Sequence, residues 1–400
     1  EWAMWDTENT NAFVEFDYIF DNDWQVKVSY NYRGYEEQDK LFYAYGTIDK
    51  DTGLGLVGWP GRYDSDIDSN LVEARTFGTF ELFGRQHEVN VGVSHASSSD
   101  TMYQYGFDYA NTPAYGATPA FPYAFDAIAE PDWFDAVLYS DIEQDLTRYF
   151  GSTKISVTNE LFVIAGFNAI DFERSGNNAG TTIDNEESEA SPYVGATYAV
   201  TENINTYVSY SDVYQPQEQY DLSGQFLAPT KGKNFEAGVK AQWLDDELLT
   251  TFAYFTADQE NLAAFAGINP ENQQYYYEGV TVESEGFEVE VVGQITDALR
   301  VQVSYTAIDV EDEAGNDANL WAPRDVVTFQ LGYELPAVPA LTVGLGGRWQ
   351  SEISNTDYNV EQGSYFLANA YATYAVTNDL TLRANINNIF DEKYITSLHT

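Results

Sequence analysis

The sequence predicts an all-β protein, a transmembrane antiparallel β-barrel, and three observations lead to this fold class. Apolar and polar residues alternate with period two along much of the chain, as in 299–306 and 380–387. Tight turns alternate with long polar connections. No apolar run approaches the roughly 20 residues of a transmembrane helix, so only strands could cross a membrane.

The connections fall into two length classes. Eight tight turns are expected at 21–23, 84–86, 158–160, 201–203, 244–247, 295–298, 336–340 and 377–379. Long polar loops are expected at 36–66, 97–137, 175–188, 214–231, 260–274, 311–321 and 353–363, with a tail from 389. Short turns at one end and long loops at the other are typical of an outer-membrane barrel, whose short turns face the periplasm. A soluble β-sandwich does not sort its connections in this way.

Eight turns join sixteen expected strands, which begin with 8–20 and end with 380–388. The clearest hairpin descends over 232–243, turns through the acidic segment 244–247 and climbs over 248–255. In this order the chain starts and ends on the loop side, whereas a complete barrel of this kind has both ends in the periplasm. We therefore expect residues 1–400 to form a partial β-barrel domain with strands missing at both ends.

Composition narrows the function classes. The formal net charge is −46, from 18 Lys and Arg against 64 Asp and Glu, and this argues against a nucleic-acid partner. Aromatic residues make up 16% of the chain, which argues against disorder. The absence of Cys excludes disulfide scaffolds and thiolate metal sites. The nucleophile, phosphate-loop and zinc-protease motifs are missing from the sequence, so we do not expect an enzyme.

Several short motifs follow one another in a defined order. They are Ser191–Gly195, Tyr207–Asp212, Tyr214–Gln217, Pro229–Lys240, Ser284–Glu290, Ala322–Arg324, Gly346–Gln350 and Asn387–Tyr394. As an ordered set they resemble the barrel of a TonB-dependent ferric-siderophore receptor, of the hydroxamate and pyoverdine-type branch, over essentially all of 1–400. The resemblance implies an outer-membrane barrel of about 22 strands. The N-terminal plug, the first strands and the last strand of that barrel would then lie outside this sequence.

The resemblance also implies a function. Receptors of this kind bind a ferric siderophore at the cell surface and import it to the periplasm, using energy delivered by the TonB complex through an N-terminal segment. We therefore expect a monomer in the outer membrane, in contact with lipopolysaccharide and other outer-membrane lipid. The only metal expected is the iron carried by the siderophore, and no cofactor is expected. The sequence does not name the siderophore.

Loop-side aromatic residues are the candidate ligand site, because their rings can stack on a flat chromophore or on hydroxamate arms. The four tryptophans among them are the favoured members. The alternative for each ring is the aromatic girdle at the membrane interface. The candidates are Trp2, Trp5, Trp59, Tyr63, Tyr103, Tyr105, Trp133, Tyr214, Tyr275 and Tyr277.

Two possible metal-binding features have less support in the sequence than the aromatic residues have as a ligand site. The stretch Asp64–Asn70 begins like a calcium loop, but Ser69 stands where Gly is expected and Arg75 where Glu is needed, so a polar strand entrance is the better interpretation. The three histidines, His87, His95 and His399, are too scattered for a zinc site. His95 could ligate haem iron, but Tyr214–Gln217 departs from the pattern of haem receptors.

The sequence leaves alternatives open for the role of the acidic loops and for the function of the barrel. Acidic loops at 186–189 and 311–313 could attract a cationic chelate or divalent ions, but the acidic excess is spread over the whole chain, which favours general surface acidity. Lys154, Arg300 and Arg383 are expected to line the barrel interior. The other function classes considered are a passive cation-preferring outer-membrane porin and a barrel enzyme such as a protease or lipase.

Overall fold

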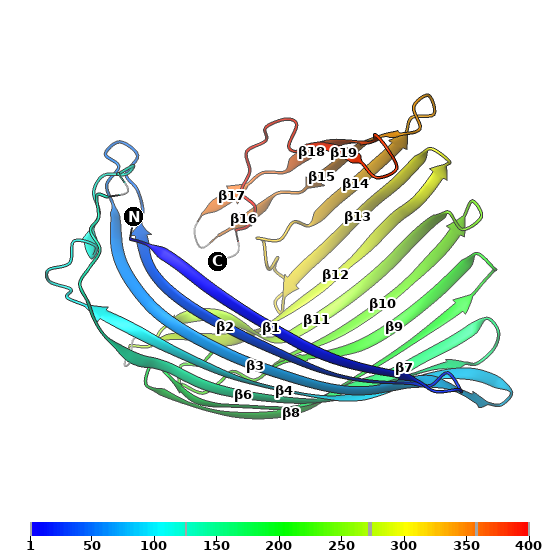
Figure 1. The fold of residues 1–400 in the computed structure, drawn as a ribbon, viewed down its shortest axis with the longest axis horizontal. Coiled ribbons are helices and arrows are strands. Elements are labelled where there is room, and N and C mark those ends of the chain that lie inside the picture. The colour runs from blue at the N-terminus through cyan, green and yellow to red at the C-terminus, as the bar shows by residue number, and fades with distance from the viewer. Residues whose placement is uncertain (1, 125, 271–273, 357–358, 399–400) are drawn as a thin grey trace. The chain divides into compact units, whose positions relative to one another are not determined.

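The computed structural model describes residues 2–124, 126–270, 274–356 and 359–398. These residues form nineteen strands and no helix (Figure 1); within them, no helix is long and apolar enough to cross a membrane. The strands are β1 (Met4–Ile19), β2 (Gln25–Gly46), β3 (Leu56–Leu82), β4 (Arg85–Phe107), β5 (Gly116–Ala117), β6 (Trp133–Ser156), β7 (Leu161–Asn178), β8 (Thr181–Ala199), β9 (Ile204–Gln215), β10 (Thr230–Trp243), β11 (Leu248–Ile268), β12 (Tyr275–Thr296), β13 (Leu299–Asp312), β14 (Asp325–Glu334), β15 (Leu341–Gln350), β16 (Ile353–Asn355), β17 (Val360–Gln362), β18 (Tyr365–Ala375) and β19 (Thr381–Ile386).

Seventeen of these strands belong to one sheet, and β16 and β17 form a separate two-stranded sheet. The chain divides into two compact units. Unit 1 comprises residues 1–80, 88–152 and 168–190, and unit 2 comprises residues 81–87, 153–167 and 191–400.

In unit 1 the first three long strands pair in sequence order and antiparallel, β1 with β2 and β2 with β3. Residues directly opposite each other share a face of the sheet. One face carries apolar rows such as Phe16, Val28 and Ala74, and the other carries polar rows such as Asp17, Lys27 and Arg75. This division is the pattern of a barrel wall with lipid on one side and a polar interior on the other.

In unit 2 the long strands from β8 to β15 pair in sequence order, and β15 pairs with β18 and β18 with β19. The hairpin of β10 and β11 closes with Trp243 opposite Leu248. Its turn places Leu244, Asp245 and Asp246 at positive φ, so three consecutive non-glycine residues take the left-handed conformation. The predicted hairpin is confirmed.

Two neighbouring rows in unit 2 show the same division of faces. The apolar row runs across five strands through Val301, Leu331, Leu345, Ala370 and Ile386. The next row runs across the same strands through Arg300, Gly332, Gly344, Tyr371 and Asn385. Polar and small residues in one row and aliphatic residues in the other again indicate an interior and a lipid-facing side.

The eight predicted turns are confirmed, each lying between two long strands within about two residues of its expected place. The sixteen predicted strands are present as the sixteen long ones. The sequence gave no signal for the short strands β5, β16 and β17, whose lengths of two and three residues are too small for a period-two pattern.

Several predicted loops are wrong in extent. Most of 36–66 is strand, because β2 continues to Gly46 and β3 begins at Leu56. In the same way β4 reaches Phe107 within 97–137, β7 and β8 meet within 175–188, β11 reaches Ile268 within 260–274, and β16 and β17 occupy part of 353–363. Strands that continue beyond a membrane need no apolar face, so the alternation used to find them is lost there. The loops 214–231 and 311–321 are confirmed in most of their length.

Candidate functional site: an aromatic cluster on the loop side of unit 1

Three of the four favoured tryptophans come together in unit 1. Phe107, at the end of β4, packs edge-on against Trp59 with ring centroids 6.1 Å apart, and edge-on against Trp133 at the same separation. Trp133 in turn meets Trp2 at 6.3 Å. These residues come from β3, β4, the start of β6 and the residues before β1, so four separate stretches of sequence supply one group of rings.

Two tyrosines extend this group. Tyr109 lies 4.5 Å from Phe107 and 5.7 Å from Trp59, while Tyr115 lies 5.2 Å from Trp59, all between ring centroids. We call Trp2, Trp59, Phe107, Tyr109, Tyr115 and Trp133 the aromatic cluster.

A short turn after β4 brings Tyr109 back onto the cluster. The carboxylate of Asp108 accepts hydrogen bonds from the Asn111 side-chain amide at 2.7 Å and from the Ala110 backbone N–H at 2.9 Å. These two donors, the amide of Asn111 first, lower the pKa of Asp108, because they stabilise its charged form. Asp at the start of a turn commonly plays this part.

The rings of the cluster differ in burial. Phe107 is only 3% exposed, whereas Trp59 and Tyr109 are 37% and 55% exposed. A cavity of about 230 Å³ lies beside it, lined by Trp59, Pro60, Gly61, Gln104, Tyr105, Gly106, Phe107, Tyr109, Val137, Leu138 and Tyr139. Exposed rings held by a buried ring are suited to stacking against a flat or amphipathic ligand.

Two further candidates lie near this cavity without joining the ring contacts. Tyr105 lines it, donates a hydrogen bond to Asp64 at 2.5 Å and has the guanidinium of Arg62 3.8 Å from its ring centroid. Tyr63 is placed by the pairing of β2 and β3, where its backbone N–H donates to the buried carboxylate of Asp39 at 3.0 Å.

Trp5 and Tyr103 are not brought into the cluster. Trp5 is 65% exposed on β1, directly opposite Asp39 of β2. Tyr103 is exposed on β4. Among the described residues, no ring contact joins either of them to the cluster.

The three candidates in unit 2 are Tyr214, Tyr275 and Tyr277, and each contacts other residues of that unit. Phe265 packs edge-on against Tyr275 at 5.6 Å and against Tyr277 at 6.1 Å. The backbone N–H of Tyr277 donates to Tyr220 O at 2.8 Å, which ties the loop after β9 to β12. Tyr214 has the Lys231 ammonium 6.0 Å from its ring centroid.

Phe107, Tyr109 and Tyr115 were not predicted from the sequence, although a signal was present for Phe107 and Tyr109. Tyr103, Tyr105, Phe107 and Tyr109 stand at every second position, which is the spacing of residues on one face of a strand. Placing 97–137 in a loop concealed that spacing.

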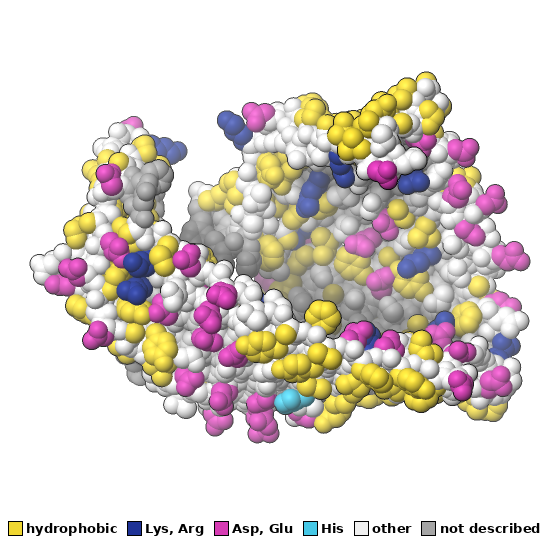
Figure 2. All heavy atoms as spheres, in the orientation of Figure 1, with side chains coloured by type: hydrophobic (Ala, Val, Ile, Leu, Met, Phe, Trp, Pro, Cys, Tyr) yellow, Lys and Arg dark blue, Asp and Glu magenta, His cyan; other side chains and the backbone are white. Residues whose placement is uncertain are grey.

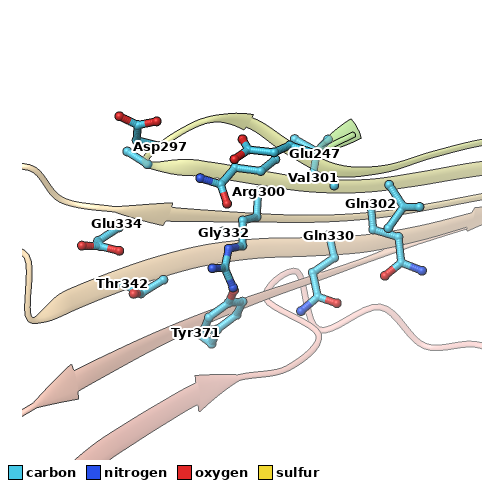
Figure 3. Close-up of a pocket in the computed structure, with 14 residues that line it drawn as sticks. Glu247, Asp297, Arg300, Val301, Gln302, Gln330, Gly332, Glu334, Thr342 and Tyr371 are labelled. Atoms are coloured by element: carbon cyan, nitrogen blue, oxygen red, sulfur yellow. The ribbon is translucent and has the colours of Figure 1, made fainter. Parts of the chain in front are cut away.

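The face of unit 2 that carries Arg300 holds a larger cavity, of about 580 Å³ (Figure 3). Arg300 extends toward Tyr371 across it, with Gln302 and Gln330 beside them (Figure 3). Arg383 lies over the same tyrosine, 5.4 Å from its ring centroid. Arg300 and Arg383 are thus on the polar face, as predicted. The third residue of that prediction is Lys154, whose Nζ lies over the ring of Phe162, 5.3 Å from its centroid.

The weaker metal motifs have structural explanations. Asp64–Asn70 lies inside β3, paired with β2, so it is not a calcium loop. Both ring nitrogens of His95 face other side chains, with Thr147 Oγ1 at 2.9 Å and Asp145 Oδ1 at 3.5 Å, which disfavours haem ligation. His399 lies outside the described residues. Carboxylates are spread over the visible face and Lys and Arg are few (Figure 2), which favours general surface acidity.

Comparison with known proteins places these features in a family. The family model described as "TonB dependent receptor-like, beta-barrel" matches residues 1–389. The ferripyoverdine receptor of Pseudomonas aeruginosa is 30% identical over 430 residues, which cover 100% of this chain and 50% of that protein. The ferrioxamine B receptor of Salmonella typhimurium is 24% identical, covering 100% of this chain and 57% of that protein.

Solved structures agree with this comparison. The crystal structure of the P. aeruginosa outer-membrane ferripyoverdine receptor bound to ferripyoverdine has a TM-score of 0.86 and 28% identity, covering 98% of this chain and 54% of the other. The chain spans about half the length of the curated relatives it matches. Together with the two faces of its sheet, the match over 1–389 shows that this chain is an outer-membrane β-barrel of the TonB-dependent receptor family.

Proposed function

We propose that this barrel is part of a receptor that binds a ferric siderophore at the cell surface and imports it to the periplasm with energy delivered through TonB. The observation that carries the proposal is the aromatic cluster in a chain of this family, built where the strands give way to long connections. Two relatives are named for iron-bearing ligands, ferripyoverdine and ferrioxamine B, which supports a ligand of the same class.

The proposed site binds its ligand non-covalently, and no bond of the ligand is made or broken. The exposed edges and faces of Trp59, Tyr109 and Tyr115 offer stacking surface and phenol or indole donors, while Phe107 holds the rings in place. Each aromatic contact contributes about 0.5–1.5 kcal/mol beyond the apolar area that it buries. The iron arrives inside the chelate, so the proposal includes no resident cofactor and no enzymatic step.

The other partners belong to the same proposal. We propose that a plug domain and a TonB-contacting segment act with this barrel, that its lipid-facing side meets lipopolysaccharide, and that one copy suffices for transport. The exposed apolar residues Leu345 and Ile386, 55% and 62% exposed in the apolar row, support the lipid contact.

Transport of radioactive iron tests the proposal. A strain lacking the gene is compared with the same strain carrying it on a plasmid, with ferripyoverdine, ferrioxamine B and further ferric siderophores supplied one at a time. We expect the plasmid to restore uptake of at least one chelate, and uptake to stop when the proton gradient is collapsed. Unchanged uptake of every chelate, with no binding to the purified protein, would contradict the proposal.

Planar-bilayer conductance separates this function from the porin alternative. A receptor with a filled interior conducts almost no ions, whereas a passive porin of this charge opens steadily and prefers cations. The family match supports the receptor, and no relative reported above is a porin.

A further inference from the structure

One carboxylate in the connection between β4 and β6 touches both a strand and the aromatic cluster. Glu130 Oε1 lies 2.6 Å from Lys40 Nζ of β2 and accepts a hydrogen bond of 3.0 Å from Trp133 Nε1. The Lys40 and Glu130 side chains are 25% and 35% exposed, so the ion pair is partly shielded from water. Lys40 is the main reason that the pKa of Glu130 lies below its usual value.

The two halves of this connection are held in different ways. The earlier half is fixed by backbone pairing: β5 pairs with β3, Thr118 N–H donates to Leu56 O at 3.0 Å, and Phe121 N–H donates to Gly53 O at 2.7 Å.

The later half is held by side chains. Trp2 Nε1 donates to Ile128 O at 3.0 Å, and Glu130 joins Lys40 to Trp133. Among these side-chain contacts, those with Lys40 and Trp133 pass through Glu130, and the one to Ile128 passes through a tryptophan of the cluster itself.

We infer that Glu130 is a positioning residue: it locks residues 126–132 to β2 and at the same time sets the orientation of the Trp133 indole within the aromatic cluster. The carboxylate has two separable roles here, an anion for Lys40 and an acceptor for the indole N–H. A charge-assisted contact is stronger than a neutral one, so a neutral acceptor would keep the indole in place but hold the segment less firmly. The predicted effect on ligand binding rests on the function proposed above.

A set of variants in the intact receptor separates the two roles. Glu130→Ala removes both, and Glu130→Gln keeps an acceptor for the indole but removes the charge. The exchange Lys40→Glu with Glu130→Lys restores an ion pair but leaves the indole N–H without its acceptor. Glu260→Gln is the matched control, because it breaks the Lys233–Glu260 pair, which is more exposed and longer at 3.6 Å.

Two readouts need no ligand. Hydrogen exchange of residues 126–132 reports how firmly the segment is held, and the ¹⁹F resonance of 5-fluorotryptophan at position 133, assigned with Trp133→Phe, reports the indole environment. We expect Glu130→Ala to raise exchange about tenfold and to shift the resonance, since local opening follows the loss of the contacts that hold a segment. Glu130→Gln should raise exchange less and leave the resonance near its original position. The charge exchange should restore slow exchange while the resonance stays shifted, and Glu260→Gln should change neither.

Wild-type exchange and an unshifted resonance in Glu130→Ala would overturn the inference, as would a charge exchange that restores both readouts. Dissociation of ferripyoverdine and ferrioxamine B is measured on the same proteins. If either chelate binds, we expect it to leave about tenfold faster from Glu130→Ala, and an unchanged dissociation rate would overturn the link to the ligand site. If neither binds, the chelate that binds best in the wider panel takes their place, and the absence of any binding chelate contradicts the proposed function, while the two ligand-free readouts still decide the positioning role.

Discussion

The ring of Trp59 meets the ring of Phe107 edge-on, with centroids 6.1 Å apart and planes inclined by 82°. This contact joins β3 to the end of β4, and through the second contact of Phe107 it brings Trp59 into the same group as Trp133. Two tryptophans that the sequence places in separate connections therefore share one buried neighbour, and this arrangement brings their rings into one candidate binding surface.

Replacing Trp59 or Trp133 by Ala should weaken binding of the ferric chelate by about 1–3 kcal/mol, because each ring supplies stacking area in the aromatic cluster. The change is measured by titrating the chelate against the fluorescence of the purified receptor. Trp5→Ala serves as the control, because Trp5 lies on β1 without a ring contact to the cluster. Equal losses in all three variants would show that the cluster is not the binding site.

Phe107→Ala should weaken chelate binding at least as much as Trp59→Ala, although Phe107 is buried and has little surface to offer a ligand. Its loss leaves a cavity beneath the cluster and costs about 3–5 kcal/mol of local stability. Phe107→Leu fills most of that volume and should keep much of the affinity. Calorimetric titration of the chelate into the original protein and into the Trp59→Ala, Phe107→Ala and Phe107→Leu variants tests this. An affinity unaffected by Phe107→Ala would contradict the supporting role of Phe107.

Gly344→Ala should destabilise unit 2 by roughly 1–3 kcal/mol. A Cβ at this position would lie 2.1 Å from Tyr371 Cε1 and 2.7 Å from Leu331 O, so the backbone would have to move. The temperature at which the barrel unfolds on an SDS gel measures the effect.

Gly363→Ala is the control for that change, because a Cβ there would meet no atom within 4 Å. Adding Tyr371→Ala to Gly344→Ala should recover part of the stability by removing the ring but not the carbonyl contact. No recovery, or an equal loss in Gly363→Ala, would contradict the packing argument.

Acid should loosen the connection between β9 and β10 through Asp221. Its carboxylate accepts hydrogen bonds from Ser223 Oγ at 2.6 Å and from Gln225 N–H at 3.0 Å, and these donors, Ser223 first, lower its pKa. A lowered pKa in the folded state means that the stabilisation is complete above the ordinary Asp value of about 3.9 and is lost as pH falls through the folded value.

Hydrogen exchange of residues 216–229, corrected for the intrinsic effect of pH, measures this loss. We expect protection to decline below about pH 4 in the original protein. Asp221→Asn carries no titrating group at this position and should show no such decline. The same decline in both proteins would assign it to another group.

The regular part of the fold could be predicted from the sequence because each strand near a turn has one apolar and one polar face. The pairing of β10 with β11 and the turn at 244–247 follow from that alternation and from the acidic turn residues. The ends of β2 and β3 could not be predicted, because residues such as Glu36 and Asp66 are polar on a face that is apolar nearer the turns. Nothing in a period-two pattern distinguishes such a polar strand from a loop.

The candidate site was predictable only in part, for a related reason. Aromatic content on the loop side pointed to Trp2, Trp59 and Trp133, but contacts between distant segments decide which rings meet. Trp5 is also a loop-side tryptophan but lies outside the cluster. The spacing of Tyr103, Tyr105, Phe107 and Tyr109 indicates a shared strand face, but it does not show that Phe107 is the buried ring at the centre of the cluster.

The function proposed for this barrel is recognition of a ferric siderophore through its aromatic cluster. The most direct measurement is equilibrium binding of ferripyoverdine, ferrioxamine B and a wider panel of ferric siderophores to the intact receptor and to the Trp59→Ala, Trp133→Ala double variant, with the iron-free siderophores alongside. We expect saturable binding of at least one ferric chelate, weakened about tenfold or more in the double variant and unaffected by Trp5→Ala. Saturable binding that survives the double variant unchanged, or no binding of any chelate by a protein that conducts ions steadily in planar bilayers, would contradict it.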